Sequence, residues 1–209
     1  MAKKYNPDSP LMQFADTVAD IIFLSVFWMV GCIPILTIGT STTALYYATM
    51  KSIRREGSIS KDFFKSYKEN LKQSVLVELI LLAAAALLYL SIKAAAGISV
   101  LYLLSAILLF LCVITAGYLF PLLSRFNQTV LALFRNALLI GFSNFPYTVA
   151  ITVLNVLPVL VFIVWPTGFM RLLLIMLFAA PGLIARINST LLMRVFAKYE
   201  DDTTANTDG

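Results

Sequence analysis

The segment VLVELILLAAAALLYLSIKAAAG, residues 75–97, decides the fold class of this chain. It has 23 residues and carries only two charged side chains, Glu78 and Lys93. A helix rises about 1.5 Å per residue, so about 20 apolar residues cross the hydrocarbon core of a bilayer. The next 22 residues, 98–119, are uncharged. These two stretches, joined by a tight turn around Gly97, predict a transmembrane helical hairpin.

Three further apolar stretches are long enough, or nearly so, to span a membrane: residues 21–38, 147–165 and 172–193. Pro158 indicates a kink in the fourth stretch of the chain, and Pro181 interrupts the fifth. Five spans in all predict that the chain crosses the membrane several times.

The predicted fold class is therefore all-α, a polytopic membrane helical bundle of about five transmembrane helices with additional interfacial amphipathic helices. Residues 1–199 form a single membrane domain in this prediction. Residues 200–209 are acidic and polar, and we expect them to be a disordered tail.

The composition excludes a soluble enzyme domain. Hydrophobic residues make up 60% of the chain and charged residues 13%, whereas about 25% is usual for charged residues in soluble proteins. The chain has no histidine, which excludes Ser-His-Asp and Cys-His systems and histidine metal sites. Cys32 and Cys112 lie in separate apolar stretches and are expected to be small buried hydrophobic residues. We expect no enzymatic activity, no catalytic residue, no cofactor and no metal.

Residues 39–74 form the largest predicted extramembrane segment. A helix over 44–56 is expected to end at Gly57, and a second helix is expected to begin at Ser60. Apolar residues recur every fourth position in this second helix, and lysines occupy other faces. The pattern predicts a basic amphipathic helix in the headgroup region, with anionic lipid headgroups as its partner; the alternative is a helix packed on the rest of the protein with a solvated lysine face. The apolar positions are Phe63, Tyr67, Leu71 and Val75, and the lysines are Lys61, Lys65, Lys68 and Lys72.

Residues 125–145 contain apolar runs too short to cross a membrane, so we expect an interfacial helix there. Lysine and arginine cluster in residues 51–72, in 125–145 and near the C-terminus, which favours a cytoplasmic location for these segments. A positive charge of this kind in a membrane protein indicates orientation and not nucleic-acid binding.

Five true spans place the N-terminus outside, although Lys3 and Lys4 disfavour that side. The alternative is that Pro34 and Gly39 break residues 21–38 into a re-entrant helix, which leaves the N-terminus inside.

Several motifs are similar to those of one family. The segment PILTIGTSTTALYY, residues 34–47, resembles the "P-x-x-T-x-G-x-x-x-T-A-L-Y-Y" element of the YesL family of bacterial multipass membrane proteins. Residues 62–70 resemble its "F-F-x-x-F/Y-K-x-N" element, and residues 120–126 its "F-P-L-L-A-R-F" element, with Ser124 in place of alanine. The resemblance covers residues 12–199.

The resemblance implies a membrane protein of this size whose biochemical role is unassigned and whose genes lie near carbohydrate ABC-transporter components. It therefore implies an accessory role in sugar uptake, with the permease as the expected partner. It carries over no catalytic or binding residue.

Glu78 and Arg186 are ionisable residues inside the predicted spans, where a charge costs roughly 2.5–3.5 kcal/mol on insertion scales. Both are expected near the cytoplasmic side, where they could form a structural pair, the alternative being a proton or substrate relay. The hydroxyl-rich residues after Gly39 are expected to cap a broken helix or to bind an anion. The candidate partner-docking or functional residues are Pro34, Thr37, Gly39, Thr43, Phe63, Phe64, Lys65, Glu78, Phe120, Pro121, Arg125, Phe126, Asn136, Arg186 and Asn188.

Three classes of function follow from these observations. The first is a non-catalytic accessory or regulatory protein that binds a transporter permease, through an element around Arg125. The second is a small transporter or channel for a small solute, functioning as an oligomer, since discontinuous helices suit that role. The third, a membrane enzyme acting on lipids, is disfavoured because the spans contain a single carboxylate. The sequence does not indicate the oligomeric state.

Overall fold

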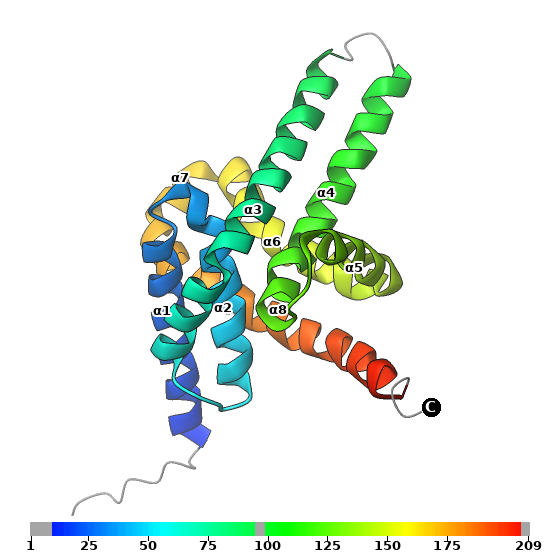
Figure 1. The fold of residues 1–209 in the computed structure, drawn as a ribbon. Helices are drawn as coiled ribbons and strands as arrows, with labels where there is room; N and C mark the ends of the chain where they lie inside the picture. Colours follow the sequence, from blue (N-terminus) through cyan, green and yellow to red (C-terminus); the bar gives the residue numbers. More distant parts are fainter. Residues whose placement is uncertain (1–9, 95–98, 206–209) are drawn as a thin grey trace, which may run out of the picture.

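The computed structural model describes residues 10–94 and 99–205, and these residues form helices without any strand. The helices are α1 (Pro10–Gly31), α2 (Ile38–Ile53), α3 (Ile59–Ala94), α4 (Ser99–Arg125), α5 (Val130–Ser143), α6 (Phe145–Val164), α7 (Pro166–Arg171) and α8 (Leu173–Ala205), and a single 3-10 turn covers Ile35–Thr37. Figure 1 shows their arrangement. The predicted all-α fold is confirmed.

Within the described residues, five helices are long and apolar enough to cross a membrane. They contain the segments Met12–Gly31, Ile59–Ala94, Val100–Arg125, Phe145–Val164 and Met176–Tyr199. The chain is thus a multipass membrane protein, as predicted. The predicted turn around Gly97 lies outside the described residues, but α3 and α4 run antiparallel, since Ser91 Oγ donates to Ser105 Oγ at 3.0 Å. Their hairpin projects beyond the other helices (Figure 1).

The first predicted span, residues 21–38, is wrong in its bounds. Helix α1 begins at Pro10 and ends at Gly31, before Pro34, whose ring nitrogen has no hydrogen to continue a helix. The chain then turns, and α2 runs back along α1. Ser52, near the end of α2, donates a hydrogen bond to Asp20, whereas Trp28 Nε1 donates to Thr42 Oγ1 at 3.1 Å. The start of α1 and the end of α2 therefore lie at the same end of the bundle.

Residues 39–74, predicted as one extramembrane segment, contain a core helix of the bundle. Helix α2 begins at Ile38, six residues before the predicted start, and packs against α1, α3, α4 and α8. Many of its buried residues are small or carry hydroxyl groups, and Thr43 and Thr49 donate back to the carbonyls of Gly39 and Leu45. Because the hydroxyls of Thr43 and Thr49 are satisfied within the helix, these two residues can lie in the core, whereas the buried hydroxyl of Thr40 has no partner among the described residues.

Helix α3 is continuous over 36 residues, so the predicted amphipathic helix and the second span are one element. At about 1.5 Å per residue it is about 54 Å long, more than a bilayer core requires. Phe63 is buried and Tyr67 is partly buried against the core, whereas the four lysines of this segment are exposed. One face of the first half of α3 therefore packs on the protein and its lysines are exposed, while the contact of these lysines with anionic headgroups stays a prediction.

The turn between α2 and α3 is held by Asp62. Its carboxylate accepts from Lys51 Nζ at 2.7 Å and from the backbone N–H of Ser58 at 2.9 Å. The hydrogen bond to Asp62 raises the pKa of the Lys51 amine. Gly57 has a φ of +73° and lies against the Asp62 carboxylate, so this position favours glycine.

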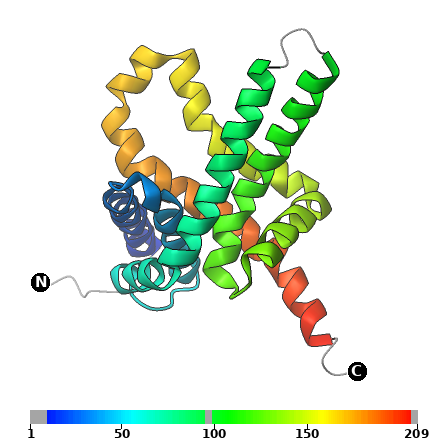
Figure 2. The ribbon, with the colours of Figure 1, turned by 45° about the horizontal axis from the view of Figure 1, so that its top comes forward.

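The remaining helices complete the bundle (Figure 2). Helix α5 is 14 residues long, about 21 Å, too short to cross a bilayer, and it begins where Thr129 Oγ1 accepts from the N–H of Ala132. Helix α8 packs closely on α1, because a Cβ on Gly182 would lie 2.3 Å from the carbonyl oxygen of Ile21. Residues 200–205 continue α8, which contradicts the predicted disorder there; residues 206–209 lie outside the described part of the chain.

Candidate functional site

The broken helix is closed by a buried carboxylate from another helix. Glu78 Oε2 accepts a hydrogen bond from the backbone N–H of Gly39 at 3.0 Å, and Glu78 is only 7% exposed. Gly39 is in the first turn of α2, where backbone N–H groups have no partner within the helix and attract negative charge. Glu78 therefore supplies a hydrogen-bond acceptor for one of the backbone N–H groups in the first turn of α2.

The side chains around this contact leave little free space. A Cβ on Gly39 would lie 2.5 Å from Phe120 Cε1, so only glycine fits at that position without rearrangement. One turn further along α2, Thr43 Oγ1 lies 3.1 Å from Ser74 Oγ of α3. We call Gly39, Thr43, Ser74, Glu78 and Phe120 the Glu78 joint. Four of these five residues were candidates from the sequence, and Ser74 was not.

The turn that precedes the joint is stabilised by Thr37. Its hydroxyl lies 2.8 Å from the carbonyl oxygen of Gly31 and 2.7 Å from that of Pro34. Ile33, Ile35 and Leu36 at this turn are 77%, 72% and 53% exposed. The tip of the α1–α2 hairpin is therefore apolar and uncovered.

The predicted pairing of Glu78 with Arg186 is wrong. Arg186 lies at the other end of α2, where its guanidinium donates to Ser52 Oγ and to Thr17 Oγ1, each at 3.4 Å. Ser52 in turn donates to Asp20. These residues line a polar cavity of about 740 Å³ between α1, α8 and the α2–α3 turn, whose ionisable side chains are Asp16, Asp20, Arg55, Glu56 and Arg186.

Arg125 lies at the end of α4, against aromatic side chains. Its guanidinium carbon is 5.9 Å from the ring centre of Phe126 and 6.0 Å from that of Phe196. Arg125 also lines a cavity of about 300 Å³ with Lys51 and Arg54. This arrangement places three basic side chains at the end of the bundle where α2 and α4 terminate.

The other sequence candidates are spread over the structure. Pro121 is buried inside α4, and Asn136 Nδ2 donates to Gln128 Oε1 at 2.6 Å, which ties α5 to the loop before it. Phe63 and Phe64 stack with Phe27 of α1, at ring-centre distances of 5.7 and 5.4 Å. Lys65 is exposed.

Asn188 of α8 connects three helices. Its Nδ2 donates to the hydroxyl oxygen of Tyr46 on α2 at 3.1 Å and to Asn155 Oδ1 on α6 at 2.9 Å. Asn188 is fully buried, and its hydrogen bonds hold α2 and α6 to α8.

Asn155 is a functional candidate that the sequence reasoning missed. It is exposed near the middle of α6, which contains no charged residue. Its Oδ1 accepts a hydrogen bond from Asn188 Nδ2, but no group of the described residues accepts a hydrogen bond from its own Nδ2. A lone asparagine at the centre of an uncharged span was the available signal.

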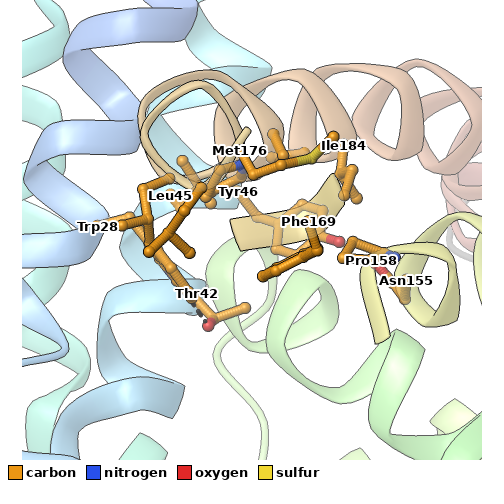
Figure 3. A pocket seen from close by; sticks show the side chains of 14 residues that line it. Trp28, Thr42, Leu45, Tyr46, Asn155, Pro158, Phe169, Met176 and Ile184 are labelled. Carbon is orange, nitrogen blue, oxygen red and sulfur yellow. Dashed lines mark hydrogen bonds between the residues drawn. The ribbon is translucent and has the colours of Figure 1, made fainter. Parts of the chain in front are cut away.

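Two cavities meet at Asn155. One, of about 310 Å³, lies between α1 and α2 on one side and α6, α7 and α8 on the other; its lining includes Trp28 and Phe169 (Figure 3). The second, of about 410 Å³, lies between α4 and α6 and is also lined by α2. Thr42, Tyr46 and Asn155 line both cavities.

The described residues contain no group of three or more His, Cys, Asp or Glu side chains that could hold a metal ion. Cys32 and Cys112 are free thiols.

Residues 21–92 match the model of a family described as "Protein of unknown function, DUF624". The matched segment begins within α1 and includes α2 and the α2–α3 turn, together with Gly39 and Glu78 of the Glu78 joint. Searches against curated proteins and against solved structures found no match to this chain.

Proposed function

We propose that this protein is a non-catalytic accessory or regulatory protein of the cell membrane, which binds the permease of a carbohydrate ABC transporter. The sugar-transport setting comes from the resemblance of its motifs to those of the YesL family. A binding role is supported by one surface of the molecule, the outer face of α5.

The outer face of α5 carries an exposed stripe that is mainly apolar. Leu131, Leu139 and Phe142 are 83%, 54% and 60% exposed, and the exposed Arg135 lies among them at helical spacing. The opposite face, with Leu133 and Ala137, is fully buried. We call Leu131, Arg135, Leu139 and Phe142 the α5 stripe.

The α5 stripe suits a partner helix better than lipid alone. A helix buried on one face and apolar on the other presents anchors at helical spacing, as amphipathic helices do in a groove. Arg135 within the stripe adds a charge that an acidic side chain of the partner would neutralise. Helix α5 also begins close to Arg125, so the stripe and the basic end of the bundle are neighbouring parts of one proposed docking region.

Co-purification with defined permeases tests this proposal. The chain is expressed with the tagged permease subunits of carbohydrate ABC transporters from its own organism, and recovery in mild detergent is measured. Leu131→Gln and Arg125→Ala are each expected to reduce recovery severalfold, whereas Leu71→Gln, an exposed leucine on α3, leaves it unchanged. Equal recovery of all variants would contradict docking through α5. Solute flux by the purified protein alone in proteoliposomes would favour the transporter function instead.

We also propose that the basic end of the bundle is cytoplasmic. The start of α1, the α2–α3 turn and the end of α4 share this end, where lysine and arginine are concentrated. This orientation puts the N-terminus inside, in contrast to the count of five true spans. Lys3 and Lys4 lie outside the described residues, but their charge favours the same orientation.

A re-entrant α1–α2 hairpin reconciles this orientation with the fold. The turn before α2 lies beside Glu78, and α3 continues for 16 residues beyond Glu78 to Ala94, about 24 Å. If the α3–α4 hairpin spans the bilayer, the α1–α2 turn ends within the hydrocarbon. The exposed apolar residues Ile33, Ile35 and Leu36 at its tip suit lipid better than water.

A further inference from the structure

We propose that the cavity between α4 and α6 binds an uncharged amphiphile, an alkyl chain that carries a hydroxyl or carbonyl oxygen, and that Asn155 recognises this oxygen. The proposal is independent of permease binding, because it depends on the open cavity between α4 and α6 and not on the α5 stripe.

The orientation of the Asn155 amide is the first observation. Its Oδ1 is fixed by the hydrogen bond from Asn188, so the donor side of the amide points away from α8. Nδ2 lies 3.9 Å from the position of a Cβ on Gly117, on α4 across the cavity. The free N–H groups of Asn155 therefore face the space between α4 and α6.

The lack of an acceptor for the Asn155 Nδ2 is the second observation. Leaving an amide donor in an apolar environment without a hydrogen-bond acceptor costs roughly 1–3 kcal/mol of folding free energy, as measured with protein variants. Asn155 is near the middle of an uncharged span, and no residue of the described chain accepts from its Nδ2. A ligand with an oxygen acceptor in the cavity would remove this cost.

The walls of the cavity define the rest of the ligand. Apart from Thr42, Tyr46, Thr152 and Asn155 the lining side chains are apolar, and none is a carboxylate, lysine or arginine. A charged ligand would have no partner for its charge, so the ligand is neutral. The cavity volume of about 410 Å³ is within the range of small-molecule sites.

Gly117 provides the space for such a ligand. A Cβ at this position would make only ordinary contacts, 3.6 Å from Ile151 Cγ2 and 3.9 Å from Asn155 Nδ2. A larger side chain there would occupy space in the cavity beside Asn155. Gly117→Val is therefore the variant chosen to fill the proposed site.

Photolabelling of the full chain in detergent tests the proposal. The first probe is a diazirine-bearing alkanol, the second is the matching hydrocarbon without oxygen, and the third is an uncharged lipid, a diacylglycerol with a diazirine in its acyl chain. The alkanol or the lipid is expected to label residues 113–120 or 152–159 saturably. Labelling by the alkanol alone identifies a free amphiphile as the ligand, and labelling by the lipid alone identifies a bilayer lipid through its ester carbonyl.

Three variants give the expected pattern. Asn155→Leu is expected to raise the half-saturating concentration of the oxygen-bearing probe about tenfold. A change of this size corresponds to the loss of about one hydrogen bond between probe and protein. Gly117→Val abolishes labelling of the cavity, and Asn127→Leu in the exposed α4–α5 loop behaves like the parent. The hydrocarbon probe shows no dependence on residue 155.

Other results overturn the proposal. Equal labelling of the parent and of folded Asn155→Leu by the oxygen-bearing probes would show that the cavity accepts alkyl chains without recognition. Labelling confined to other segments would exclude the site. If Asn155→Leu does not fold, Gly117→Val still decides, because unchanged labelling in that variant contradicts the proposed location.

Discussion

Glu78 of α3 accepts a hydrogen bond from the backbone N–H of Gly39, the second residue of α2, over 3.0 Å. The contact joins residues 39 positions apart in the sequence and places a carboxylate at the positive end of a helix dipole. It explains how an acidic side chain is accommodated in a largely apolar span without a basic partner.

Glu78→Ala is predicted to lower the free energy of unfolding by about 1–3 kcal/mol, since it leaves a buried N–H without an acceptor. Glu78→Gln keeps an amide oxygen as acceptor and is predicted to cost less. Thermal unfolding in detergent, followed by far-UV circular dichroism, measures both changes. Glu69→Ala, at an exposed position of the same helix, is the control. A Glu78→Ala protein as stable as this control would contradict the structural role of the joint.

Gly39→Ala is predicted to destabilise the protein by about 1–3 kcal/mol, because its Cβ would overlap the Phe120 ring. Phe120→Leu makes room at this point, so the double variant is predicted to be more stable than the sum of the two single effects. The two single variants and the double variant form a cycle in which the coupling is measured directly. Additive effects would show that Phe120 is not the obstacle.

Asp62→Ala is predicted to cost about 1 kcal/mol or more, since it removes the acceptor for the Ser58 N–H and for Lys51. Lys51→Met removes the partly exposed ion pair and the contact of the ammonium with the Tyr47 ring, and it is predicted to cost less, about 0.2–1 kcal/mol. Urea unfolding at one pH compares the two variants. A larger effect of Lys51→Met would assign the stability of the turn to the ion pair instead.

The same ion pair predicts a dependence on alkaline pH. Asp62 raises the pKa of Lys51, so folding is favoured while the lysine is charged. The contribution is complete below the ordinary lysine pKa, about 10.4, and is lost as the pH rises through the higher pKa of the folded state. Unfolding curves of the parent and of Lys51→Met should therefore converge in this alkaline range. A constant difference between them across this range would contradict the assignment.

The proposed orientation predicts that residue 10 and residue 57 are labelled from the same side of the membrane. Single cysteines are introduced at these positions after Cys32 and Cys112 are replaced by serine, and a membrane-impermeant maleimide is applied to intact cells and to inverted vesicles. Both positions should react only in inverted vesicles, and Ile35→Cys should react in neither preparation. Labelling of residue 10 in intact cells would restore a true first span.

The apolar spans were predictable because a bilayer imposes a simple rule on length and hydrophobicity. Residues 147–165 and α6 nearly coincide, and residues 125–145 contain the short helix α5. In the segment before the second span, apolar residues at every fourth position predicted a helix correctly. The pattern could not show that this helix and the span are one continuous helix. The change from lysines to leucines indicates a change from water to lipid around the helix, but it does not indicate whether the helix is interrupted.

Three features of the candidate site could not be predicted from the sequence. The hydroxyl-rich start of α2 has the composition of a loop, and its burial depends on hydrogen bonds to its own carbonyls. Glu78 and Arg186 were paired from their depth along separate helices, but depth does not determine which helices are neighbours. The donor side of Asn155 became recognisable only when Asn188 was seen to occupy its oxygen.

Helix α2 is attached to α3 near both of its ends. Asp62 binds Lys51 near the last turn of α2, and Glu78, 16 residues further along α3, binds Gly39 in the first turn. The two attachment points on α3 are about 24 Å apart along a single uninterrupted helix. Helix α2 is therefore held against α3 at two separated points, so a tilt or slide of α2 alone would break at least one of these contacts. Helix α6 packs mainly against α4 and α8, and the two cavities lined by Asn155 lie between it and α2. A displacement of α6 is therefore expected to leave the α2–α3 pair in place.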